Sequence, residues 1–390
     1  MFANLSLRIR NAAGSFWREL RTAIRSDPDA RWTLFSAAVA AVLLAYTKSP
    51  TGDTFSLFTD HLHHTRAAWT FFHLGLEAYI EPFSKTGREV YYPQPGITWG
   101  QLPIPYPPGM FVVFAPMALI GRYIPMGSVV YAKLAIVYML VLMHAGLWGL
   151  VKLLRQQELS YFALLVLMLW IFGLRAGLQG FYDGAFLWTG VIATQRLIAR
   201  RPASAIIWYT ISGVISYRGA AFASFALLAV WQLLRSDASL ARKASVLGFA
   251  AVGSLLTAGA FWLLMTHSTV ATRHGAESSL LPLDFRGYAV IFIGAALCVA
   301  LSLSASLLVG ATAAVSTILC VLHAGHSWHG FVCFPVAMAL AIERPKRDYA
   351  PLLVIVYIAF MWQFAFGYPP FHWLDELLRF IQRGGAYNKA

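Results

Sequence analysis

Residues 128–151, SVVYAKLAIVYMLVLMHAGLWGLV, decide the fold class because these 24 residues contain a single charged side chain, Lys133. A helix needs about 20 mostly apolar residues to cross a bilayer, and in lipid its backbone polar groups must be hydrogen bonded within the protein. Ten further apolar stretches follow the same pattern. The sequence therefore predicts an all-α polytopic membrane protein with about eleven transmembrane helices, at 34–48, 128–151, 159–175, 183–199, 203–217, 219–234, 244–266, 287–302, 305–322, 329–343 and 349–367.

The composition predicts one membrane domain. Of the 390 residues, 58% are hydrophobic and 12% are charged, against about 25% charged in a soluble domain. We expect a transmembrane domain at 34–367, a basic N-terminal segment at 1–33 and an amphipathic C-terminal tail at 368–390. The N-terminal segment is too long and too polar to be the start of a signal peptide, so we expect the first helix to be retained.

The net charge of +13 suggests either nucleic-acid binding or the bias of membrane proteins toward Lys and Arg in cytoplasmic loops. The distribution favours the second. With a cytoplasmic N-terminus, the inner segments hold seventeen basic and seven acidic residues, and the outer and intramembrane segments hold ten and eight. The basic clusters placed inside, beyond the N-terminal segment, are Lys152 and Arg155; Arg196, Arg200 and Arg201; Arg235, Arg242 and Lys243; and Arg344, Lys346 and Arg347.

This topology requires that residues 107–124, PPGMFVVFAPMALIGRYI, do not cross the membrane. Prolines restrict the backbone, so we expect a short re-entrant or interfacial helix there. A full crossing would invert every later loop. We expect an integral membrane protein of the bacterial inner membrane, with residues 49–127 forming an outer loop.

Asp60 lies in this outer loop, in the sequence FTDHLHH at the start of an amphipathic stretch. A carboxylate at the membrane surface can act as a catalytic base that accepts a proton from a hydroxyl group. The alternative is an Asp that caps the N-terminus of the loop's helix.

The outer loop resembles that of the GT-C superfamily of polyprenyl-phosphate-dependent glycosyltransferases, the mannosyltransferases above all. The matching elements follow the first helix in order, namely Asp60; Phe71, Phe72, Gly75 and Tyr79; and Pro105, Tyr106, Pro107 and Pro108. The resemblance implies transfer of a sugar, most often mannose, from a polyprenyl-phosphate donor to a glycolipid or glycan acceptor at the outer, periplasmic membrane face. It also implies that Asp60 is the catalytic base and that Tyr106 contacts substrate.

Two further elements extend the resemblance. The stretch LRAGLQGFYDG is similar to a Gly-x-x-Asp segment of the family, which implies substrate contacts by Arg175 and Asp183; Asp183 can equally be a helix cap, since the helix dipole favours a carboxylate there. In SYRGAAF, Arg218 matches a Lys or Arg that faces the donor phosphate. A guanidinium can donate two parallel hydrogen bonds to phosphate oxygens. The alternative is an Arg that extends to lipid head groups.

Lys133 is a charge within an apolar run and hence a candidate for donor-phosphate binding, unless it extends outward to the interface. His323, His326 and His329 in HAGHSWHGF match a segment that contacts substrate in the family, and His61 and His64 flank Asp60. The three-residue spacing of His323, His326 and His329, with no carboxylate nearby, does not favour a metal site. The histidines beside Asp60, without a second nearby acid, do not decide the question. The family resemblance leaves a divalent cation open.

Cys298, Cys320 and Cys333 have no CxxC spacing and are interpreted as small core residues. Two other functions compete with the transferase. A transporter or lipid flippase also has many helices and intramembrane charges, but we find no pair of related halves with broken helices. A non-catalytic GT-C-like subunit that binds lipid or a partner is the third.

Overall fold

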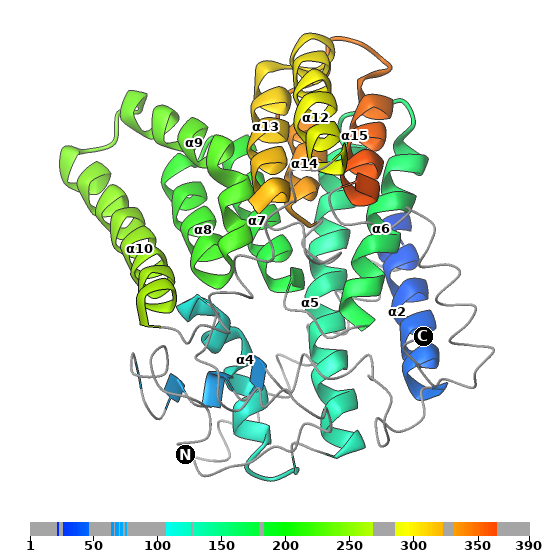
Figure 1. Ribbon diagram of the computed structural model, residues 1–390, viewed down its shortest axis with the longest axis vertical. Helices are drawn as coiled ribbons and strands as arrows, with labels where there is room; N and C mark the ends of the chain where they lie inside the picture. Colours follow the sequence, from blue (N-terminus) through cyan, green and yellow to red (C-terminus); the bar gives the residue numbers. More distant parts are fainter. Residues whose placement is uncertain are drawn as a thin grey trace.

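The computed structural model describes residue 22 and residues 26–46, 64–65, 67–69, 71–72, 75, 107–125, 128–178, 183–267, 285–322 and 331–364. Within these ranges every regular element is a helix (Figure 1). The elements are α2 (Pro28–Tyr46), α4 (Pro108–Ile120), α5 (Val129–Arg155), α6 (Phe162–Leu178), α7 (Asp183–Ile198), α8 (Pro202–Ile215), the 3₁₀ helix η4 (Tyr217–Phe222), α9 (Ala223–Arg235), α10 (Leu240–His267), α12 (Phe285–Ser304), α13 (Leu307–Leu322), α14 (Phe334–Ile342) and α15 (Ala350–Phe364).

Several of these helices suit a membrane. Four are long and apolar enough to cross it by length and composition, at Lys133–Arg155, Tyr217–Arg235, Leu240–Leu263 and Gly287–Ser304, and six further apolar helices are shorter. The chain is therefore an all-helical integral membrane protein. A helix occupies each of the eleven predicted ranges, but a helix such as α8, with 14 residues, extends only about 21 Å.

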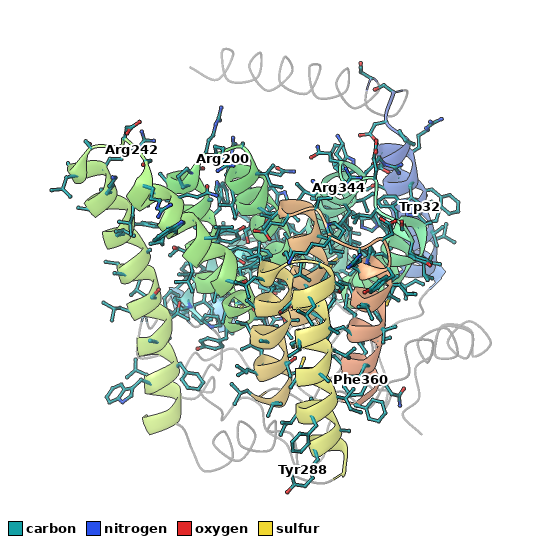
Figure 2. All side chains as sticks on the ribbon, turned by 90° about the horizontal axis from the view of Figure 1, so that it is seen from above. Trp32, Arg200, Arg242, Tyr288, Arg344 and Phe360 are labelled. Carbon is teal, nitrogen blue, oxygen red and sulfur yellow. The ribbon has the colours of Figure 1, made fainter. Side chains whose placement is uncertain are left out.

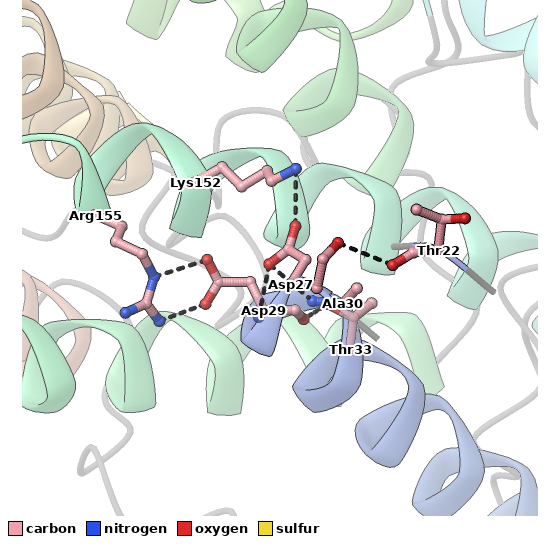
Figure 3. Close-up of polar contacts among 8 residues, drawn as sticks. Thr22, Asp27, Asp29, Ala30, Thr33, Lys152 and Arg155 are labelled. Carbon is pink, nitrogen blue, oxygen red and sulfur yellow. Dashed lines mark hydrogen bonds and ion pairs between the residues drawn. The ribbon is translucent and has the colours of Figure 1, made fainter. Parts of the chain in front are cut away.

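The N-terminus of α2 is attached to the C-terminal end of α5 (Figure 3). Lys152 Nζ lies 2.9 Å from Asp27 Oδ2, and Arg155 Nε donates a 2.8 Å hydrogen bond to Asp29 Oδ2. Acidic groups at the start of a helix and basic groups at the end complement the helix dipoles. The two helices are consequently antiparallel, which is the relative direction that a topology without a crossing at 107–124 requires.

The basic loops lie together. Figure 2 shows Arg200, Arg242 and Arg344 at one end of the bundle and Tyr288 and Phe360 at the other. The α12–α13 and α14–α15 connections are joined at the first of these ends, where the backbone N–H of Arg347 donates to the carbonyl of Ser304 over 2.9 Å. We refer to the end of the bundle that carries Arg200, Arg242 and Arg344 as the basic end.

A buried polar network fixes α2 to its neighbours within the bundle. His144 Nδ1 lies 2.7 Å from the carbonyl oxygen of Leu140, so it carries the proton and donates. Nε2 then accepts from Ser36 Oγ at 3.0 Å, and Ser36 Oγ accepts from Trp170 Nε1 at 2.6 Å. Every polar group of this network has a partner, so His144 is interpreted as a structural residue.

The three cysteines are buried and free, in line with the prediction of small core residues. The sulfur atoms of Cys320 and Cys333 lie 3.8 Å apart.

Candidate functional site

The structure joins two of the predicted site residues directly. Asp183 is the first residue of α7, and Arg218 belongs to η4, which connects α8 to α9. Arg218 Nη1 donates a short charged hydrogen bond to Asp183 Oδ1. The side chain of Asp183 is 0% exposed and that of Arg218 is 11% exposed. The two charges therefore form a buried ion pair.

Close helix packing determines where Asp183 lies. A Cβ atom at the following residue, Gly184, would come within 2.5 Å of the backbone nitrogen of Met143 and 2.8 Å of its Cα. Only glycine allows the start of α7 to approach the backbone of α5 so closely. The Asp183 carboxylate is thus held at a helix N-terminus, where the helix dipole stabilises its charge.

The turn that carries Arg218 is fixed in a similar way. Ser216 Oγ accepts a 3.3 Å hydrogen bond from the backbone N–H of Arg218, and the Ser216 carbonyl accepts one of 2.7 Å from the N–H of Gly219. A Cβ atom at Gly219 would come within 2.5 Å of the Cα of Gly213. The backbone on both sides of Arg218 is therefore held against α8.

One oxygen atom of this pair has no partner within the described part of the chain. Asp183 Oδ2 is buried and has no hydrogen-bond partner among the described residues. A buried carboxylate oxygen without a partner is unfavourable, so a donor group such as a hydroxyl is expected to complete the site. Arg218 carries a guanidinium group, the kind of side chain that can bind phosphate oxygens.

The pair lies at the end of the bundle opposite the basic end. Helix α7 finishes at the loop that contains Arg200, and α8 starts from the same loop. Asp183 and the connection after α8 are consequently at the far ends of these helices. Lys133 is also far from the basic end, because 19 residues of α5, about 29 Å of helix, separate it from Lys152.

The described residues of the 49–127 segment pack close to this site. The ring of Phe71 stacks on Phe111 of α4 with 4.3 Å between centroids, and the ring of His64 lies 5.0 Å from that of Phe114. Helix α4 in turn contacts the end of α8, where a Cβ atom at Gly109 would lie 2.6 Å from the carbonyl oxygen of Val214. The described residues of this segment therefore lie close to the end of α8, where Val214 precedes Arg218 by four residues.

The remaining predicted residues are distributed as follows. His64 is buried and Lys133 is half-buried. Arg175 belongs to the last turn of α6. Asp60, His61, Tyr106, His323, His326 and His329 lie outside the described residues.

Asp183 and Arg218 are separate candidates in the sequence, and their pairing was not predicted. The available signal was the opposite charge of two residues next to consecutive apolar runs. Ser216, whose hydroxyl accepts the hydrogen bond that orients the turn, was also not predicted. Among the described residues, no group of three or more His, Cys, Asp or Glu side chains could hold a metal ion.

Comparison with known proteins adds no family, since no protein-family model and no curated protein matches the chain.

Proposed function

We propose that the protein is a GT-C-type glycosyltransferase that moves a sugar, mannose first, from a polyprenyl-phosphate donor to a glycolipid or glycan acceptor. In this proposal the chain crosses the bacterial inner membrane about eleven times, with its N-terminus in the cytoplasm and the site at the periplasmic face. The observation that carries the proposal is the buried Asp183–Arg218 pair at the end of the bundle opposite the basic loops.

The chemistry assigned to Arg218 is leaving-group stabilisation. When the bond between the sugar C1 and the phosphate oxygen breaks, negative charge develops on the polyprenyl phosphate. A guanidinium fixed beside that oxygen stabilises the charge more in the transition state than in the ground state. Lys133 is the second residue proposed to bind the donor phosphate.

Asp60 is proposed as the base. It accepts the proton of the acceptor hydroxyl while the hydroxyl oxygen forms the new bond to C1 from the face opposite the phosphate. The bond to the phosphate breaks as the new bond forms, so the configuration at C1 is inverted.

Asp183 is proposed to position Arg218 and to bind substrate. Its Oδ1 orients the guanidinium, and its unpartnered Oδ2 accepts a hydrogen bond from a sugar hydroxyl. Arg175, His61, His64, Tyr106 and the residues of the 323–329 segment are proposed to contribute further substrate contacts. This set contains no required metal, and addition of EDTA tests whether a divalent cation takes part.

The proposal is tested with the full chain reconstituted in nanodiscs with radiolabelled polyprenyl-phosphate mannose and a glycolipid extract. We expect a labelled product with the wild-type chain. We expect loss of product with Asp60→Asn, a large loss with Arg218→Gln and partial retention with Arg218→Lys. Arg200→Asn at the basic end is the matched control and should keep full activity.

The same preparation separates the competing functions. A transporter or flippase would move the labelled lipid across a liposome membrane without forming a product. A non-catalytic subunit would bind the lipid and do neither. Full transfer activity in Asp60→Asn would overturn the base assignment.

A further inference from the structure

The basic end carries charge that the bundle itself does not neutralise. Lys152 and Arg155 are paired with Asp27 and Asp29. The exposed basic residues of three neighbouring loops form no ion pair with a carboxylate of the described residues; they are Arg200, Arg201, Arg235, Arg242, Arg344, Lys346 and Arg347. The same loops contain only three acidic residues, Asp237, Glu343 and Asp348.

Arg200 is held in an unfavourable backbone conformation at this end. Its φ angle is +56°, in the left-handed region where glycine is the usual residue after a helix. The turn is closed by the N–H of Arg201, which donates to the carbonyl of Arg196 over 2.9 Å. A glycine would form this turn without strain, so the arginine is explained by its side chain and not by the turn.

Exposed tryptophans indicate the depth at which the basic side chains lie. Trp231 on α9 is 53% exposed, and the guanidinium of Arg235 lies 3.9 Å from the centre of its ring. Trp32 is also exposed and lies at the same end as Arg200 and Arg344 (Figure 2). Tryptophan prefers the boundary between hydrocarbon and head groups, so the arginines beyond these rings reach the level of the lipid phosphates.

We propose that the basic end binds the head groups of anionic phospholipids in the leaflet that surrounds it. The arginines match this partner because a guanidinium binds phosphate oxygens in pairs, and because a basic cluster next to a membrane helix is attracted to an anionic surface. The inference concerns the end of the bundle away from the Asp183–Arg218 pair and does not depend on the proposed transferase activity.

The test uses the full chain in nanodiscs that contain phosphatidylcholine with a minor fraction of phosphatidylglycerol. Native mass spectrometry counts the lipids of each kind that remain bound. We expect the wild-type chain to retain phosphatidylglycerol preferentially. We expect Arg200→Asn to reduce that preference about fivefold, and Arg200→Asn combined with Arg242→Gln to reduce it further. Asparagine tolerates the left-handed conformation, so Arg200→Asn removes the charge and keeps the turn.

Arg122→Gln is the control because Arg122 is exposed and follows α4, which runs along α5 away from the basic end: Tyr138 donates to the carbonyl of Val113 and Tyr131 to that of Met117. We expect this variant to leave the preference unchanged. Equal retention of both lipids by the wild-type chain would overturn the proposal, as would an equal loss in Arg122→Gln and Arg200→Asn. An oligonucleotide that displaces phosphatidylglycerol from the basic end at equal charge concentration would assign this surface to nucleic acid instead.

Discussion

Replacing Asp183 by asparagine should remove the carboxylate that neutralises the buried guanidinium of Arg218. The structure makes this expensive, because both side chains are almost fully removed from solvent, at 0% and 11% exposed. Removing one partner of a buried ion pair typically destabilises a protein by about 3–5 kcal/mol. We therefore expect Asp183→Asn to lower the free energy of unfolding by about that amount, measured by SDS titration of the purified chain in mixed micelles.

The chain contains a matched control for this prediction. The ion pair between Asp29 and Arg155 has the same chemistry, and Asp29 is also buried, at 6% exposed, but Arg155 is 51% exposed. Its charge keeps contact with solvent when Asp29 is replaced, so the loss should be nearer the roughly 1 kcal/mol of an exposed pair. Asp29→Asn should therefore have a small effect in the same titration. Equal losses in Asp29→Asn and Asp183→Asn would refute the argument from burial.

A double-mutant cycle isolates the interaction itself. If the loss in Asp183→Asn comes from a stranded charge, adding Arg218→Gln should restore part of the stability. The coupling energy should then be at least about 2 kcal/mol. Strictly additive losses would show that the two side chains do not interact as described.

Three further predictions concern the frame around the site and the basic end. Gly184→Ala places a methyl group 2.5 Å from the backbone nitrogen of Met143, which should lower the free energy of unfolding by about 1–3 kcal/mol; an unchanged SDS midpoint would contradict the close contact. Arg200→Gly removes the strain of an arginine at a φ angle of +56° and should raise the free energy of unfolding by about 0.5–1 kcal/mol; an unchanged or lower value would contradict the strained turn. Burial raises the pKa of Asp27, but hydrogen bonds from Lys152 and from two backbone amides outweigh it and lower the pKa; the stabilisation is therefore present above the ordinary pKa of about 4 and is lost as the pH falls through the lower folded value. Unfolding of the wild-type chain and of Asp27→Asn, compared at pH 5 and below pH 4, should differ in pH dependence, and identical profiles would exclude this contribution.

Hydropathy located the helices, while helix caps determined where several of them begin. Helix α2 starts at Pro28 and not at residue 34 as predicted, because Asp27 Oδ1 accepts from the backbone N–H of Asp29 at 2.9 Å and proline suits the first helical position. Residues 29–33 are therefore helical, although they precede the predicted apolar stretch. Helix α10 likewise starts at Leu240 and not at residue 244 as predicted. Its first turn contains charged residues, which a hydropathy pattern does not include.

One predicted segment contains two kinds of helix. The range 329–343 was predicted as a crossing; within its described residues, 331–343, α14 covers Phe334–Ile342. Pro335 lies in its first turn, where the missing N–H is tolerated, and a 3₁₀ turn precedes it. Over so few residues, sequence periodicity does not distinguish a 3₁₀ helix from an α-helix.

The site depends on contacts that no local pattern encodes. Asp183 was predicted to start a helix, and α7 does begin there, since a carboxylate suits that position. The contact with Arg218 depends on how closely α7 approaches α5 at Gly184 and α8 approaches η4 at Gly219. A glycine in an apolar run marks a position where helices can approach each other, but the sequence does not say which helix approaches.

A cryo-electron microscopy structure of the chain in nanodiscs would test the proposed donor site directly, with a polyprenyl-phosphate sugar bound to Asp60→Asn, the variant that we expect to block turnover. We predict that the donor phosphate lies within hydrogen-bonding distance of the Arg218 guanidinium, with the sugar beside Asp183 Oδ2 and residue 60. A donor phosphate bound at the basic end, or at any position away from Arg218, would contradict it.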